Sequence, residues 1–119
     1  MQPEWRPSSQ PLDVATLLEA LAHHPVVVLH FWADWNRIDR QFDEQLQAVR
    51  GEFTDRIYFG SIDTDDPRHQ EFIRQCQVGN LPAFACFIRG KPAGTVVGYR
   101  PAEELRRRFA VWLAEAAAA

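Results

Sequence analysis

The hydrophobic residues in the first third of the chain change from a helical spacing to a continuous run. The spacing i, i+3, i+4, i+7 is followed by Val14, Leu17, Leu18 and Leu21. This spacing places them on one face of a helix, for which Asp13 is the predicted N-cap. His24-Pro25 ends that helix, because the residue before a proline resists helical backbone angles. The apolar, β-branched run at 26–32 then predicts a strand covered on both faces.

The rest of the chain continues the alternation of helices and strands. A second helix is predicted from the helical spacing of Ile38, Phe42, Leu46 and Val49, with Gly51 as its stop. The other predicted elements are a strand at 56–62, a helix at about 67–77, strands at 83–88 and 94–98 joined by a turn at 90–92, and a helix that Pro101 opens. This order predicts an α/β fold, with parallel strands and a C-terminal antiparallel hairpin in one mixed sheet and helices on both faces.

Proline marks the N-terminal segment as different from the rest. Residues 1–12 contain Pro3, Pro7 and Pro11 and predict an extended arm, in which any strand is short and at an edge of the sheet. The domain itself is predicted at 13–116, and the alanines at 116–119 are expected to fray. A chain of 119 residues suits one domain.

Composition and charge narrow the classes of function. The net charge is −3 and basic residues form no stripe, which argues against nucleic-acid binding. The run Arg106–Arg108 is interpreted as the solvated face of the last helix. No apolar run reaches the ~20 residues of a membrane helix, and the N-terminus does not resemble a signal peptide. We therefore expect a cytoplasmic protein with no membrane partner.

Two short motifs carry a resemblance to the thioredoxin family. Phe-Trp-Ala-Asp-Trp at 31–35 ends a predicted strand, and Val-Gly-Asn-Leu-Pro stands at 78–82. Thioredoxins have Phe-Trp-Ala-acid-Trp followed by Cys-Gly-Pro-Cys, and a later proline that is cis and faces the active site. The resemblance implies a thioredoxin fold, with Pro82 as that proline and Gly98 beside the site.

The same resemblance implies that the redox chemistry is absent. The cysteine tetrad is replaced by Asn36-Arg37-Ile38-Asp39. Disulfide exchange needs a thiolate and a second thiol that resolves the mixed disulfide, and neither residue at the two ends of this tetrad supplies one. The family's buried acid corresponds to His30. We therefore expect no disulfide reductase activity and no catalytic residues.

Three structural interpretations follow for the residues of this region. Asn36 is a predicted helix N-cap, and Asp39 three residues later completes a predicted capping box. His30 is either a buried general base or, as we favour, a neutral core histidine with one hydrogen bond. No pair of histidines has a spacing that suggests a metal site, and no cofactor is expected.

The two cysteines, Cys76 and Cys86, are predicted to pack in the core. Cys76 lies on the apolar side of a predicted helix and Cys86 in a predicted central strand. A disulfide between them is doubtful, because it requires Cα atoms within about 7 Å. A redox-sensing thiol is the alternative interpretation.

A predicted protein-binding groove is the most specific functional expectation. The resemblance implies a shallow surface for an extended peptide, formed by Trp35, Ile38, Leu81, Pro82, Gly98 and Tyr99. The backbone of the residue before the proline is expected to pair with the peptide by strand addition. The alternative is that the two aromatic side chains are ordinary half-buried surface residues.

The favoured hypothesis is therefore a redox-inactive, thioredoxin-like module that binds a protein as an adaptor or chaperone. It resembles two uses of cysteine-less thioredoxin folds in bacteria, in holdase chaperones and in small proteins that escort hydrogenase subunits. One alternative is a single-cysteine or glutathione-linked redox protein that uses Cys86 or Cys76. The other is a structural subunit of a larger assembly.

Overall fold

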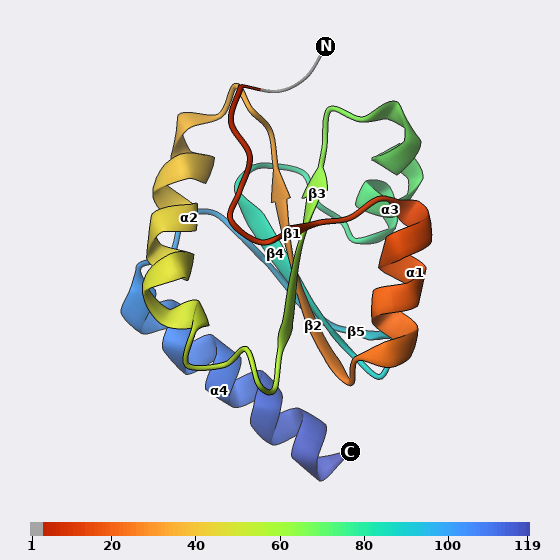
Figure 1. The fold of residues 1–119 in the computed structure, drawn as a ribbon, viewed down its shortest axis with the longest axis vertical. Helices are drawn as coiled ribbons and strands as arrows, with labels where there is room; N and C mark the ends of the chain where they lie inside the picture. The colour runs from red at the N-terminus through yellow and green to blue at the C-terminus, as the bar shows by residue number, and fades with distance from the viewer. Residues whose placement is uncertain (1–3) are drawn as a thin grey trace.

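A five-stranded mixed sheet forms the centre of the protein in a computed structural model that describes residues 4–119 (Figure 1). The strand order is β1-β3-β2-β4-β5, and the two pairs β1–β3 and β3–β2 are parallel whereas β2–β4 and β4–β5 are antiparallel. The strands are β1 (Gln10–Pro11), β2 (Val26–Trp32), β3 (Tyr58–Asp63), β4 (Ala83–Ile88) and β5 (Lys91–Val97). The predicted mixed sheet is confirmed.

Within residues 4–119, four α-helices and one short 3-10 helix surround the sheet. They are α1 (Val14–His23), α2 (Arg37–Arg50), η1 (Pro67–His69), α3 (Gln70–Gln75) and α4 (Ala102–Ala118). Helices α2 and α4 lie on one side of the sheet, and α1 and α3 on the other (Figure 1). In the part of the chain that the structure describes, no helix is both long and apolar enough to cross a membrane.

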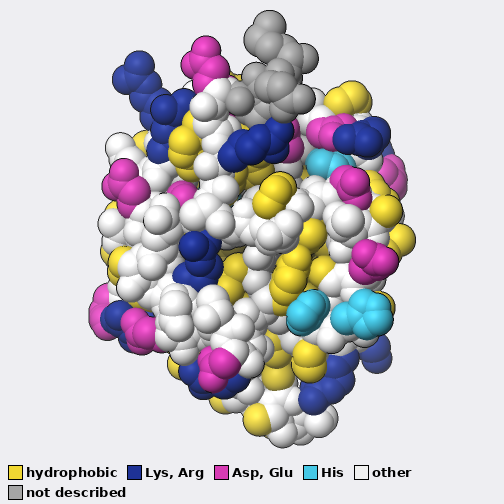
Figure 2. All heavy atoms as spheres, viewed as in Figure 1, with side chains coloured by type: hydrophobic (Ala, Val, Ile, Leu, Met, Phe, Trp, Pro, Cys, Tyr) yellow, Lys and Arg dark blue, Asp and Glu magenta, His cyan; other side chains and the backbone are white. Residues whose placement is uncertain are grey.

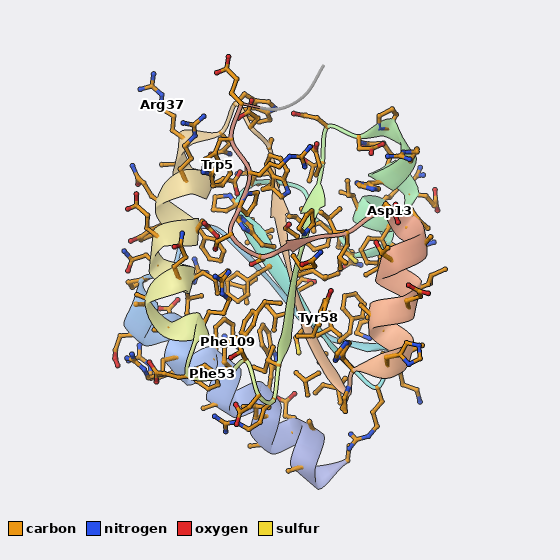
Figure 3. All side chains as sticks on the ribbon, viewed as in Figure 1. Trp5, Asp13, Arg37, Phe53, Tyr58 and Phe109 are labelled. Atoms are coloured by element: carbon orange, nitrogen blue, oxygen red, sulfur yellow. The ribbon has the colours of Figure 1, made fainter. Side chains whose placement is uncertain are left out.

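Each face of the sheet has its own hydrophobic core because neighbouring residues of a strand point to opposite faces. On one face, Val26 and Val28 of β2 pack with Phe42 of α2 and with Phe109 of α4. The ring centroids of Phe109 and Phe53 lie 5.5 Å apart, edge to face (Figure 3). The alternate β2 residues Val27, Leu29 and Phe31 pack on the other face, toward α1 and α3.

The predicted boundaries of the most apolar elements are confirmed. The predictions were wrong at some helix ends and turns, whose positions depend on the local backbone conformation. Helix α2 ends at Arg50 with Gly51 as its C-cap, as predicted, although Gly51 has φ −57° and not the positive φ common at this position. The predicted helix at 67–77 divides into η1 and α3. The hairpin turn is at Arg89-Gly90 and not at 90–92, because both residues adopt positive φ, the conformation of tight hairpin turns. Ala116 does not fray: it is buried and its carbonyl accepts from Arg89.

The N-terminal arm follows the surface of α2 before it reaches the sheet (Figure 1). Its predicted edge strand is present, but only two residues long. Before that strand, the backbone N–H of Ser8 donates to the Asp43 carboxylate of α2 at 3.1 Å, and the Ser8 hydroxyl donates to the same group at 2.9 Å. Asp43 is buried and also accepts from Gln47. The arm is thus fixed to α2 through a buried carboxylate. Residues 1–3 of the predicted arm lie outside the described residues.

Candidate binding site at the start of helix α2

Helix α2 begins directly after the motif at 31–35, and Asn36 fixes its first turn. The Asn36 side-chain oxygen accepts from the backbone N–H of Ile38 at 3.0 Å, as a helix N-cap does. Its amide nitrogen donates to the carbonyl of Leu81 at 3.3 Å. The predicted N-cap is confirmed, and the same side chain connects the helix start to the loop before Pro82.

Asp39 is directed into the protein, so the predicted capping box is wrong. Its side chain is fully buried, and Oδ1 lies 2.8 Å from Nε2 of His30 on β2. Oδ2 accepts from the backbone N–H of Ala33 at 3.2 Å. A buried imidazole and a buried N–H both need a hydrogen-bond partner, and the Asp39 carboxylate satisfies the two together.

Aromatic packing continues from the His30–Asp39 pair into the core. The centroids of the His30 and Phe42 rings are 4.7 Å apart, and Phe42 in turn stacks on Phe84 at 5.4 Å. Nδ1 of His30 has no hydrogen-bond partner among residues 4–119. The expected core histidine with one hydrogen bond is therefore observed, with Asp39 as its partner. Within the described part of the chain, His30 has no hydrogen bond to a hydroxyl or thiol that it could activate as a nucleophile.

The loop at 78–82 lies beside the helix start and is joined to the end of β5. The Leu81–Pro82 peptide bond is cis, and the Pro82 carbonyl accepts from Gly98 N–H at 2.7 Å. Gly98 has φ +105°, a conformation that favours glycine. Leu81 N–H donates to the Asn80 side chain at 2.9 Å, while its carbonyl accepts from Asn36. Both backbone groups expected to pair with a peptide thus already have partners within the chain.

The residues predicted to form the groove differ in exposure. Trp35 is 69% exposed, Ile38 is 42% exposed and Tyr99 is 39% exposed, whereas Leu81 and Gly98 are half-buried and Pro82 is buried. Hydrogen bonds connect the helix start to the 78–82 loop and that loop to Gly98, so the three segments are neighbours. Three of the six predicted groove residues, all of them large and apolar or aromatic, are therefore exposed around this junction.

Trp35 is hydrogen-bonded to another loop, whereas other residues near it project freely. The Trp35 indole N–H donates to Asp65, in the loop after β3, at 3.2 Å. Arg37 extends away from the body of the protein (Figure 3). Val97, at the end of β5, is 40% exposed. Sequence reasoning missed Asp65 and Val97, since no local pattern brings either residue near the helix start.

The N-terminal arm also contacts the motif, and sequence reasoning missed this as well. The Asp34 carboxylate accepts from the backbone N–H groups of Glu4 and Trp5, both at 3.0 Å. The Trp5 ring packs edge-on against Trp32 at 5.7 Å, and the Arg40 guanidinium lies 5.6 Å from the Trp5 centroid (Figure 3). An aromatic residue within a proline-rich arm was the only signal for this docking.

The cysteines lie away from the helix start. Cys86 is fully buried in the core shared with α2 and α4, and Cys76 is half-buried on the opposite face of the sheet. This placement explains why they form no disulfide. Burial raises the pKa of the Cys76 thiol to about 11. Burial, together with the Glu115 charge, raises the pKa of Cys86 to about 12.

The fold and the motifs define a family. The thioredoxin family model matches residues 9–110, and the chain therefore belongs to the thioredoxin family. A solved thioredoxin of Malassezia sympodialis superposes with a TM-score of 0.74 at 22% identity, over 91% of each chain. Mitochondrial thioredoxin 3 of Saccharomyces cerevisiae gives a TM-score of 0.72 at 18% identity, over 84% of this chain and 92% of the other. At these identities the two structures support the fold alone.

Similar sequences include proteins of different length. Thioredoxin from Alicyclobacillus acidocaldarius is 24% identical over 99 residues, 83% of this chain and 92% of that protein. The chloroplastic thioredoxin-like protein HCF164 of Arabidopsis thaliana is 27% identical over 88 residues, which are 73% of this chain and 34% of that protein. The chain thus spans about a third of HCF164, and that similarity covers only one part of the longer protein.

Proposed function

We propose that this protein is a redox-inactive, thioredoxin-like module that binds an extended protein segment at the start of α2, as an adaptor or chaperone. The main support comes from Asn36 and Asp39, which stand at the two positions where thioredoxins carry cysteines and which have structural roles here. Asn36 caps the helix and holds the Leu81 loop, and Asp39 is buried against His30. Both residues have structural hydrogen bonds and neither supplies a thiol.

Exposed apolar side chains support the binding part of the proposal. Trp35, Ile38 and Tyr99 lie around the same junction, and large aromatic residues contribute most to binding at many protein interfaces. Because both backbone groups of Leu81 are already engaged, recognition in this proposal depends mainly on side chains. A peptide that also pairs with the Leu81 N–H first displaces the exposed Asn80 side chain.

The thiol alternative has less support. The raised pKa values of both cysteines leave little thiolate at neutral pH, and the thiolate is the reactive form. The alternative of a structural subunit predicts self-association, which the binding experiment below also detects.

One assay tests the redox part of the proposal. In insulin reduction with dithiothreitol, we expect the wild-type protein to give the uncatalysed rate, since no pair of adjacent thiols is present. The variant Asn36→Cys/Asp39→Cys is the matched positive control, because it restores a dithiol at the start of α2. Turnover by the wild type clearly above the uncatalysed rate would contradict the proposal.

A second assay tests binding, with reduced and carboxymethylated lactalbumin as a permanently unfolded probe. Fluorescence anisotropy is expected to show saturable binding, and Trp35→Ala is expected to weaken it about tenfold, the loss of one central interface residue. Val111→Ala is the matched control, because Val111 is 48% exposed but lies on α4. Absent binding, or equal losses in the two variants, would contradict the proposal. Sedimentation of the free protein separates probe binding from self-association.

A further inference from the structure

A surface hollow opens where the edge strand β1 stops early. If β1 continued toward the N-terminus, its parallel register would place Ser9 and Ser8 opposite Phe59 and Tyr58 of β3. Ser8 instead turns to the Asp43 carboxylate of α2. A hollow of about 340 Å³ remains between the arm, the end of α2 and the first residues of β3. Figure 2 shows a hydrophobic strip on this face, with a basic side chain on one side and histidines on the other.

Arg50 provides the positive charge of this hollow. It is half-buried, and one guanidinium nitrogen donates to the hydroxyls of Ser8 at 2.7 Å and Ser9 at 3.4 Å. Within residues 4–119 it forms no ion pair with a carboxylate. A guanidinium carries five N–H donors in a planar fork that suits an oxyanion. Two hydroxyl contacts therefore leave donors for a ligand.

The charged groups in and near the hollow do not neutralise Arg50 directly. Asp43 reaches it only through the Ser8 hydroxyl, which donates to the carboxylate and accepts from the guanidinium. Arg56 has its own partner in Asp55 at 3.4 Å. His24 also lines the hollow, and it adds no negative charge.

An aromatic surface lies in the same hollow. The Tyr58 ring stacks on His24, with centroids 4.3 Å apart, and Phe59 also contributes to the lining. Flat rings favour a flat or apolar ligand through stacking and burial of apolar area. Arg50 and the stacked Tyr58–His24 ring pair thus border the same hollow.

We propose that this hollow binds a small organic anion, whose carboxylate or similar oxyanion pairs with Arg50 while its flat body packs against Tyr58. The binding site is separate from the junction at Trp35, which lies at the C-terminal end of β2. It rests on none of the residues that carry the proposed protein binding. The turn of Ser8 toward the Asp43 carboxylate, just before β1, leaves this space open.

Benzoate is a suitable probe because it combines a carboxylate with a flat ring. We expect ¹⁵N NMR titration of the full chain to give saturable shifts at the backbone amides of Ser9 and Tyr58 and at the Arg50 side chain. Benzyl alcohol, which has the ring without the charge, and acetate, which has the charge without the ring, are expected to bind at least about tenfold more weakly.

Variants separate this site from general anion binding. Arg50→Gln is expected to weaken benzoate at least about tenfold, the loss of a charge-assisted hydrogen bond. Arg107→Gln, which removes an exposed arginine of α4 outside the hollow, is expected to leave the affinity unchanged. If Arg50→Gln does not fold, Tyr58→Leu replaces it, with an expected severalfold loss. No saturable shift, or saturable binding that the hollow variants leave intact, would overturn the proposal.

Discussion

The inner and outer sides of the first turn of α2 have opposite characters. Asp39 faces inward, where a fully buried carboxylate is held by His30 and the Ala33 N–H. Trp35 and Ile38 face outward, where they are exposed. The inner side therefore stabilises the fold, whereas the outer side leaves apolar surface available. Because the two sides differ in burial and contacts, substitutions on each side should have different consequences.

The largest expected effect is on the inner side. Asp39→Ala leaves the His30 imidazole and the Ala33 N–H without their acceptor in a space closed to water. We expect the free energy of unfolding to fall by about 3 kcal/mol or more, as measured by urea denaturation.

A matched control and a second variant make this prediction specific. Asp55→Ala removes an exposed carboxylate, whose pair with Arg56 is 3.4 Å long, and is expected to change stability by less than about 0.5 kcal/mol. The double variant His30→Leu/Asp39→Leu removes both buried polar groups together. Its loss in free energy of unfolding should be smaller than the sum of the losses in His30→Leu and in Asp39→Leu. Additive losses would show that the two side chains do not act as a pair.

The next effect concerns the remaining thiols. Raising the pKa of Cys76 from 9.0 to about 11 lowers its thiolate fraction about a hundredfold at pH 8. The greater nucleophilicity of a more basic thiolate offsets part of this loss. We expect iodoacetamide to label Cys76 at least about tenfold more slowly at pH 8 than a free thiol, with a rate that rises as the pH approaches 11.

The unfolded state is the control for the thiol prediction. In urea, both cysteines should react at the rate of an ordinary thiol, since burial no longer raises their pKa values. Cys86, which is fully buried, should react more slowly than Cys76 in the native protein. Native labelling of either cysteine at the unfolded rate would instead favour the single-cysteine redox alternative.

The sequence predicted the sheet well because burial determines its pattern. The run at 26–32 is buried at every position and β4 spans 83–88 as predicted, since an apolar run covered on both faces has few other structures available to it. The arm was predicted only in outline. Its contacts with Asp34 and Asp43 join residues about thirty positions apart, and no local pattern encodes them.

The candidate site shows where local rules fail. The capping rule correctly assigned Asn36, because its partner, the Ile38 N–H, is two residues away. The same rule misassigned Asp39, because the deciding partner, His30, lies on β2. Sequence reasoning noted that His30 replaces the family's buried acid and that Asp39 replaces a cysteine, but it treated the two replacements separately. In the structure they are one hydrogen-bonded pair.

The smallest expected effect on stability is at Asn36, between the inner and outer sides of the start of α2. Asn36 serves both, because its oxygen caps α2 and its amide donates to Leu81. Asn36→Ala should lower the free energy of unfolding by about 1 kcal/mol, within the range of a lost N-cap.

Asn36→Asp separates the two roles, since it keeps the capping oxygen and removes the donor to Leu81. We expect urea denaturation to show a smaller loss for this variant than for Asn36→Ala. The Leu81 carbonyl then lacks its partner within the chain and is available to a bound peptide, so affinity for the unfolded probe should be equal to or higher than that of the wild type. A large loss of both stability and probe binding in Asn36→Asp would show that the Asn36–Leu81 bond itself holds the outer surface in shape.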